Sequence, residues 1–214
     1  MRVDLDLLLD TGAVPGADGC LSHRLDVMRE VARLFARRPP ATLVETGCQS
    51  DLLLHAHGMS TTILGAFAER YRAILHTVDV DAGNMRQCRE LTKEYAAFIR
   101  YAVGDSIAFL SSFEDVIDFL YLDSYDFDMH CREQSRRHQL GEIEAAWRKL
   151  RPGSIVLLDD ANVQMWFHMP LDPLDVQGKT AYAHRFVLAH GARCLADHPS
   201  YQRLYVIEDR GSAP

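Results

Sequence analysis

The sequence lacks the features that mark several common protein classes. No apolar stretch approaches the roughly 20 residues that span a bilayer, and the leucines near the start are interrupted by Asp4, Asp6 and Asp10, unlike a signal peptide. The five cysteines are scattered, odd in number and without a Cys-x-x-Cys pair, so neither a disulfide framework nor a zinc knuckle is predicted. We therefore expect a protein of a reducing, cytoplasmic compartment with no membrane segment.

Positive charge is also scarce. The formal net charge is −7 at pH 7, and lysine and arginine form no long basic run, so no nucleic-acid partner is expected. With 214 residues the chain is long enough for one sizeable domain. We assign residues 41–210 to that domain and residues 1–40 to an N-terminal arm and helix.

The N-terminal helix is predicted from Ser22, a capping residue, to Arg37, before two prolines. Leu25, Met28 and Phe35 share its apolar face. No strand of the predicted sheet precedes this helix. We therefore expect the apolar face to pack on a neighbouring subunit, in a homo-oligomer, or to cover the active site.

The stretch from Leu43 to Asp79 organises the rest of the chain. A short apolar run meets Glu45 and Gly47, a helical pattern begins near Gly58, and a second apolar run ends at Asp79. This order of strand, loop, helix and strand with a terminal acid is typical of a nucleotide-binding βαβ unit, although Gly-x-Gly-x-x-Gly is absent. A buried βαβ unit without a ligand is the alternative.

Each part of this unit has a physical role in ligand binding. Gly47 lets the backbone approach a ligand where a side chain would clash. The N–H groups near Ser60 and Thr61, at the helix start, can receive a polar or anionic group. The carboxylate of Asp79 can accept both hydroxyls of a ribose.

Further strands and helices alternate along the chain. Helices are predicted near 81–95, 106–113 and 179–190, and the polar stretch 124–139 is predicted as a loop that enters a helix continuing to Leu150. Strands are predicted at 98–103, 116–122 and 154–158, a sharp turn at 151–153, and a closing hairpin at 193–197 and 203–208. The fold class is therefore α/β, a three-layer, doubly wound, mostly parallel seven-stranded sheet with an antiparallel C-terminal hairpin.

Acidic residues gather at one end of the predicted strands. The strand starts carry small residues, whereas the strand ends carry Glu45, Asp79, Asp105, Asp123, Asp159 and Asp160. Ligands of such sheets bind beyond the carboxyl ends of the strands, so this bias predicts a site there.

Five motifs carry a resemblance to a known family. The segments VETG, HTVDVD, VGDS, IDFLYLD and LRPGSIVLLDD resemble, in order, the motifs of the Rossmann-like S-adenosylmethionine-dependent methyltransferases over about residues 40–210. Among subgroups the chain most resembles the O-methyltransferases of sugar-tailoring and antibiotic pathways. It departs from the family where Cys48 to His57 separates Gly47 from Gly58, which we interpret as an added substrate-facing loop.

The resemblance implies roles for single residues. Glu45 and Gly47 would line the methionine end of S-adenosylmethionine, and Asp79 would bind its ribose. The third motif, with Gly104, Asp105 and Ser106, would lie by the adenine. Capping of the next helix is an equal alternative for Asp105. Asp123 is assigned to the cofactor site as well as to catalysis.

Asp123, Asp159 and Asp160 also form a candidate metal site. In the resembling subgroup, acids at these positions can hold Mg²⁺, and oxygen ligands suit that ion. Carboxylates that converge would repel one another unless a cation or protons intervened. Adjacent strand residues point to opposite faces, so both acids of the pair could bind only if the chain leaves the strand there. The alternative is that one caps a turn and another meets the cofactor's ammonium.

His130 and His168 are candidate general bases, because they are predicted on loops above the strand ends and histidine titrates near neutral pH. Exposed loop histidines are the alternative for each.

The predicted activity is methyl transfer from S-adenosylmethionine to a hydroxyl of a small molecule, assisted by Mg²⁺ or by a base. A nicotinamide-dependent oxidoreductase is the first alternative, although the chain lacks Gly-x-Gly-x-x-Gly and a Tyr-x-x-x-Lys pair. A non-catalytic binding module that keeps the fold is the second.

Overall fold

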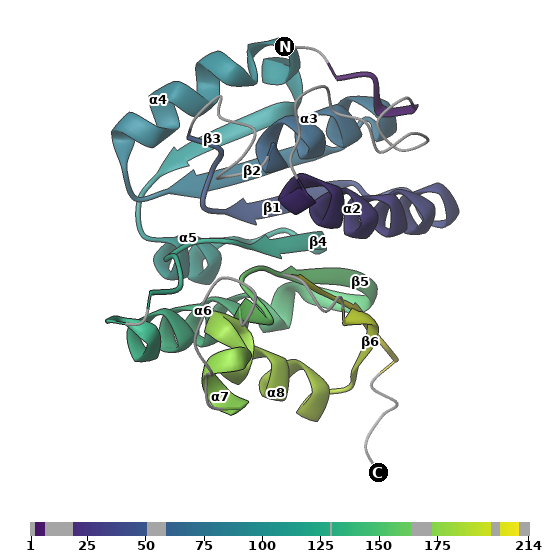
Figure 1. Cartoon of the computed structure of the whole chain (residues 1–214). Coiled ribbons are helices and arrows are strands. Elements are labelled where there is room, and N and C mark those ends of the chain that lie inside the picture. Colours follow the sequence, from purple (N-terminus) through teal and green to yellow (C-terminus); the bar gives the residue numbers. More distant parts are fainter. Residues whose placement is uncertain are drawn as a thin grey trace. The chain divides into compact units, whose positions relative to one another are not determined.

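A computed structural model describes residues 3–6, 19–50, 59–128, 130–163, 173–197 and 202–209. The chain forms two compact units, Met1–Asp105 (unit 1) and Ser106–Pro214 (unit 2). Figure 1 labels their elements. Within the described ranges, no helix has the length and hydropathy of a membrane span.

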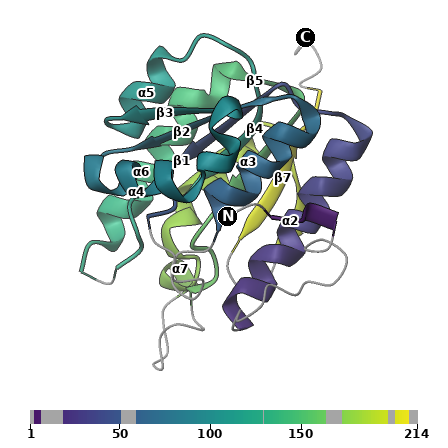
Figure 2. The ribbon, with the colours of Figure 1, turned by 90° about the horizontal axis from the view of Figure 1, so that it is seen from above.

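Unit 1 is a three-stranded parallel arrangement with helices. Its elements are α2 (Gly19–Arg37), β1 (Thr42–Thr46), α3 (Ser60–Tyr71), β2 (Ile74–Asp79), α4 (Ala82–Leu91), the 3₁₀ helix η1 (Lys93–Phe98) and β3 (Ile99–Val103). The strands β1, β2 and β3 run side by side, with β2 in the middle (Figure 2). Helix α3 contacts β1 and β2, and α4 contacts β2 and β3.

Helix α2 begins at Gly19, before the predicted Ser22, and Leu25, Met28 and Phe35 on its apolar face are buried. The ring of Phe35 meets the rings of Phe67 and Tyr71 on α3 edge to face, with centroids 5.4 and 5.7 Å apart. Phe35 therefore packs on α3, and the expectation that the helix contacts a partner or covers the active site stays a prediction. A homo-oligomer and the domain boundary at residue 40 stay predictions.

Unit 2 holds the remaining strands. Its elements are α5 (Ser106–Ser112), β4 (Ile117–Leu122), α6 (Arg132–Ala146), η2 (Trp147–Lys149), β5 (Leu150–Leu158), α7 (Pro173–Val176), η4 (Gly178–Thr180), α8 (Ala181–Ala189), β6 (Ala192–Asp197) and β7 (Arg203–Ile207). Strands β4 and β5 are parallel, and β7 is antiparallel to both β5 and β6.

The described residues thus form seven strands, ordered β3-β2-β1 in unit 1 and β4-β5-β7-β6 in unit 2. The predicted α/β fold class is confirmed, with mostly parallel strands and an antiparallel C-terminal hairpin. One local prediction was wrong: residues 151–153 lie inside β5 rather than in a turn before it. The register of β4 and β5 shifts between Ile117 and Phe119, so the segment is accommodated as a bulge with Gly153 at φ 87°.

Candidate functional site

In unit 1, Asp79 connects three loops at the ends of the strands. Its carboxylate accepts hydrogen bonds from the backbone N–H of Cys48 at 3.2 Å and of Asp81 at 2.8 Å. Its carbonyl accepts the N–H of Gly104 at 3.0 Å, and Gly47, at φ 77°, donates to the carbonyl of Val78. Three residues predicted from the sequence, Gly47, Asp79 and Gly104, are therefore brought together.

Exposed apolar side chains adjoin this acid. Val80, directly after Asp79, is 78% exposed, and Val103, paired with Asp79 in the β2–β3 register, is 55% exposed. Large apolar side chains are normally removed from water. The carboxylate can accept hydrogen bonds from sugar hydroxyls, and the exposed apolar surface beside it can contact a flat base.

Glu45 is completely buried rather than open to a ligand. Its Oε2 accepts the hydroxyls of Thr61 at 2.7 Å and Thr77 at 2.8 Å. The Thr61 oxygen also accepts the backbone N–H of Gln49 at 2.9 Å. Glu45 and Thr61 thus tie the loop after β1 to the start of α3, beside the buried Ser60. Contact of these residues with a cofactor stays a prediction.

Cys48 is not a reactive nucleophile in this arrangement. A hydrogen bond with Cys88, burial, and the negative charges of Asp79 and Glu45 all raise the pKa of its thiol. A thiol with a raised pKa stays protonated, and the thiolate is the nucleophilic form. Most of the loop interpreted as substrate-facing, residues 51–58, lies outside the described residues.

In unit 2, three acids follow neighbouring strand ends. Asp123 comes after β4, and Asp159 and Asp160 come after β5. Asp160 has a φ of 54°, so the chain leaves the strand direction there. The Tyr121 hydroxyl lies 2.6 Å from Asp159 Oδ2 and 3.0 Å from Asp123 Oδ2, and Gln202 donates to that hydroxyl at 3.1 Å.

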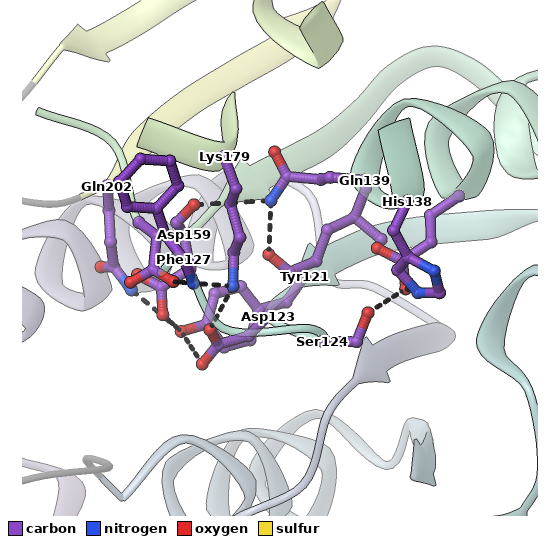
Figure 3. A network of polar contacts seen from close by, with 12 residues as sticks. Tyr121, Asp123, Ser124, Phe127, His138, Gln139, Asp159, Lys179 and Gln202 are labelled. Carbon is purple, nitrogen blue, oxygen red and sulfur yellow. Dashed lines mark hydrogen bonds and ion pairs between the residues drawn. The ribbon is translucent and has the colours of Figure 1, made fainter. Parts of the chain in front are cut away.

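A lysine that the sequence analysis missed lies among these acids (Figure 3). The side chain of Lys179, from η4, is completely buried, and its Nζ lies 3.2 Å from Asp123 Oδ1 and 3.1 Å from Asp160 Oδ2. Burial alone would lower the pKa of Lys179, but Asp160, Asp123 and the neighbouring acids together raise it. Lys179 is therefore an ammonium ion at neutral pH. We refer to Tyr121, Asp123, Asp159, Asp160 and Lys179 as the acid–lysine cluster.

The acid–lysine cluster does not fit Mg²⁺ as arranged. Oxygens of Asp123 and Asp160 point at an ammonium, and an oxygen of Asp159 accepts the Tyr121 hydroxyl. Across the described parts of the chain, no group of three or more His, Cys, Asp or Glu side chains is placed to hold a metal ion.

The histidines are placed differently from expectation. His130 is exposed beside Asp128, whose carboxylate accepts its backbone N–H at 2.6 Å, and His168 lies outside the described residues. His138, on α6, lies instead in a polar network, with Nε2 3.0 Å from Ser106 Oγ and 3.6 Å from Oε1 of buried Glu142.

The Ser124 hydroxyl donates to the same Glu142 oxygen at 2.6 Å, so the network reaches the residue that follows Asp123. A buried carboxylate near an imidazole favours the protonated form of the ring, which is the form that a general base takes after accepting a proton. The i, i+4 spacing of His138 and Glu142 on a predicted helix is the only sequence signal for this pair. Ser106 serves this network, and placement of Asp105 and Ser106 by an adenine stays a prediction.

The family and the fold follow from comparisons with known proteins. Residues 55–161, which make up half of the chain, match the family described as a methyltransferase domain. No curated protein matches the sequence.

Solved structures of methyltransferases share the fold. The S-adenosylhomocysteine-bound methyltransferase PaMTH1 of Podospora anserina is 14% identical, with a TM-score of 0.61, and the match covers 96% of this chain and 94% of that one. The O-methyltransferase TomG of Streptomyces achromogenes, in complex with S-adenosylmethionine, is 15% identical, with a TM-score of 0.57 and coverage of 94% and 95%.

MycE, a methyltransferase of the mycinamycin pathway in complex with Mg and S-adenosylhomocysteine, is 15% identical, with a TM-score of 0.64. The match covers 100% of this chain but 57% of MycE. These comparisons confirm the resemblance read from the five motifs: the chain belongs to the methyltransferase-domain family and is a methyltransferase of the class I, S-adenosylmethionine-dependent type.

Proposed function

We propose that this enzyme transfers the methyl group of S-adenosylmethionine to a hydroxyl group of a small molecule. The observation that carries the donor's identity is the position of Asp79 between the glycine-containing loops of unit 1, next to exposed Val80 and Val103. The acceptor class is inferred from the chemistry of unit 2 and from O-methyltransferases such as TomG that share the fold.

The residues of unit 1 fit the donor. Each oxygen of Asp79 accepts one backbone N–H, and Oδ2 also accepts a long hydrogen bond from the Cys48 thiol at 3.5 Å. A carboxylate has about four acceptor positions, so Asp79 can still accept a ribose hydroxyl. Val80 and Val103 offer apolar surface to an adenine. Gly47 has a backbone conformation that favours glycine, and the absence of a side chain would let a ligand approach its backbone.

When bound, S-adenosylmethionine supplies a sulfonium methyl that an oxygen nucleophile takes by in-line displacement. The chain's own residues would bind and orient the acceptor and accept its proton. A carboxylate of the acid–lysine cluster can accept a hydrogen bond from the acceptor hydroxyl, and we assign that role to Asp123. His138, whose Nε2 lies 3.0 Å from Ser106 Oγ and 3.6 Å from Glu142 Oε1, joins His130 and His168 as a candidate for the base that takes the proton.

Mg²⁺ has no assigned step, because the oxygens predicted to bind it already face Lys179 and Tyr121. The net charge of −7 favours a small-molecule acceptor over a nucleic acid. A cytoplasmic location stays a prediction from the sequence.

A methyl-transfer assay tests this proposal. S-[methyl-³H]adenosylmethionine is incubated with the enzyme and with paired acceptors that differ only in carrying a hydroxyl or an amine. We expect label in the hydroxyl member alone, and little with the Asp79→Asn variant. Label found only in amines would overturn the proposed acceptor class, and labelled RNA would overturn the small-molecule class.

A further inference from the structure

The acid–lysine cluster contains its own cation. Lys179 has no exposed surface, and its ammonium contacts one oxygen each of Asp123 and Asp160 at 3.2 and 3.1 Å. A buried charge is costly unless an opposite charge compensates it. Asp123 and Asp160 therefore compensate the buried charge of Lys179, and the ammonium offsets part of the repulsion between the acids.

The position of Lys179 is fixed by its own element. Gly178 packs so closely that a Cβ there would lie 2.0 Å from the backbone oxygen of Asp160, so the glycine brings η4 against the acid pair. The buried guanidinium of Arg136 donates to the carbonyls of Gly178 and Leu174, both at 3.2 Å. The ammonium is therefore held at the acids by a packed backbone rather than by a loose surface side chain.

A divalent ion and this ammonium compete for the same oxygens. Mg²⁺ requires oxygen ligands at about 2.0–2.1 Å in a near-ideal octahedron, and the inward oxygens of Asp123 and Asp160 are directed at Nζ instead. Charges of the same sign a few ångströms apart repel strongly in a protein interior.

We propose that the ammonium of Lys179 is the built-in cation of this cluster: it holds Asp123 and Asp160 in the place of a divalent metal, so the enzyme binds no metal there. Lys179 is in this account a positioning residue. Its effect on methyl transfer rests on the proposed function, whereas the effect on metal binding does not.

Metal binding is tested on the full-length protein with Mn²⁺, whose free and bound forms differ in electron paramagnetic resonance. Wild-type protein is compared with Lys179→Met, with the double variant Lys179→Met, Asp160→Asn, and with Lys149→Met. Lys149 is the matched control, because its ammonium binds the carbonyls of Ser111 and Ala145, away from the acids.

We expect Lys179→Met to bind Mn²⁺ at least about tenfold more tightly than wild type, which corresponds to about 1.4 kcal/mol. The double variant should lose this gain, and Lys149→Met should behave as wild type. Mn²⁺ binding by wild type that is lost in Asp123→Asn would overturn the proposal, as would equal binding by wild type and Lys179→Met.

If Lys179→Met does not fold, the comparison of wild type with Asp123→Asn decides alone: weak, equal binding by both supports the proposal. A second readout is methyl transfer by wild type in EDTA. Undiminished turnover supports the built-in cation, and turnover that vanishes and returns with Mg²⁺ overturns it. An absence of any turnover with every acceptor would count against the proposed function, and the Mn²⁺ experiment would still decide the role of Lys179.

Discussion

Lys179 Nζ lies 3.1 Å from Asp160 Oδ2, and the lysine is completely buried. The two residues lie in different segments of the chain, and no repeating pattern in the sequence indicates that they meet. The ion pair is formed because β5 ends before Asp160 and η4 returns to the same place with Gly178 against the Asp160 backbone. This contact places one buried ammonium against two of the three carboxylates of the acid–lysine cluster and so offsets part of their negative charge. We therefore expect it to contribute to the stability of unit 2.

Replacing Lys179 by Met should therefore lower the free energy of unfolding by about 3–5 kcal/mol, because the substitution leaves two carboxylates without their buried cation. Urea unfolding followed by circular dichroism measures the loss. The Lys149→Met control should stay within about 0.5 kcal/mol of wild type, as for other surface substitutions. A loss for Lys179→Met as small as that of the control would show that the buried ion pair is not formed.

Thr61→Val should destabilise unit 1. The substitution removes the hydroxyl that donates to buried Glu45 at 2.7 Å and accepts the N–H of Gln49 at 2.9 Å. A buried group that loses its hydrogen-bond partner lowers the free energy of unfolding by about 1–3 kcal/mol. Urea unfolding measures this loss. The matched control is Ser111→Ala, which removes one exposed hydroxyl. Equal midpoints for the two variants would contradict the bridging role of Thr61.

Asp81 gives a prediction for pH. The N–H groups of Asn84 and Gly83 donate to its carboxylate at the start of α4 and lower its pKa from the ordinary value of 3.8. A lowered folded-state pKa means that this stabilisation is present above the ordinary value and is lost as the pH falls through the folded-state pKa.

Asp81→Ala should therefore melt below wild type at neutral pH, and the difference should shrink as the pH falls below 3.8. Calorimetry at several pH values measures it. Asp81→Asn keeps an acceptor that does not titrate, so it should stay close to wild type at neutral pH. A difference between Asp81→Ala and wild type that does not change with pH would refute the assignment.

The fold was largely predictable because its signals are local. The apolar runs that end at Asp79, Asp123 and Asp159 mark β2, β4 and β5, and capping and turn residues separate the helices. The bulge at residues 151–153 was not predictable, because arginine, proline and glycine together are typical of a turn. The strand continues past them because Leu150 and Ile155, on either side, pair with β4.

The candidate site was predictable only in part. The acidic residues at the predicted strand ends indicated Asp79 and the carboxylates of the acid–lysine cluster as site residues. The partners of those acids were missed, because a polar contact between distant segments leaves no period in the sequence. Converging carboxylates do need a cation nearby, but the sequence indicated a metal ion, whereas the structure places Lys179 among these acids.

The central claim is that unit 1 binds S-adenosylmethionine through Asp79. Isothermal titration calorimetry of wild type, Asp79→Asn and the control Asp118→Asn with S-adenosylhomocysteine and with NAD⁺ tests it most directly. Asp118 pairs with Arg151 in unit 2, so its variant should bind as wild type does. The account predicts that S-adenosylhomocysteine binds wild type, that Asp79→Asn weakens this binding at least about tenfold, and that NAD⁺ gives no binding heat. Binding of NAD⁺ without S-adenosylhomocysteine, or equal affinities of wild type and Asp79→Asn, would contradict it.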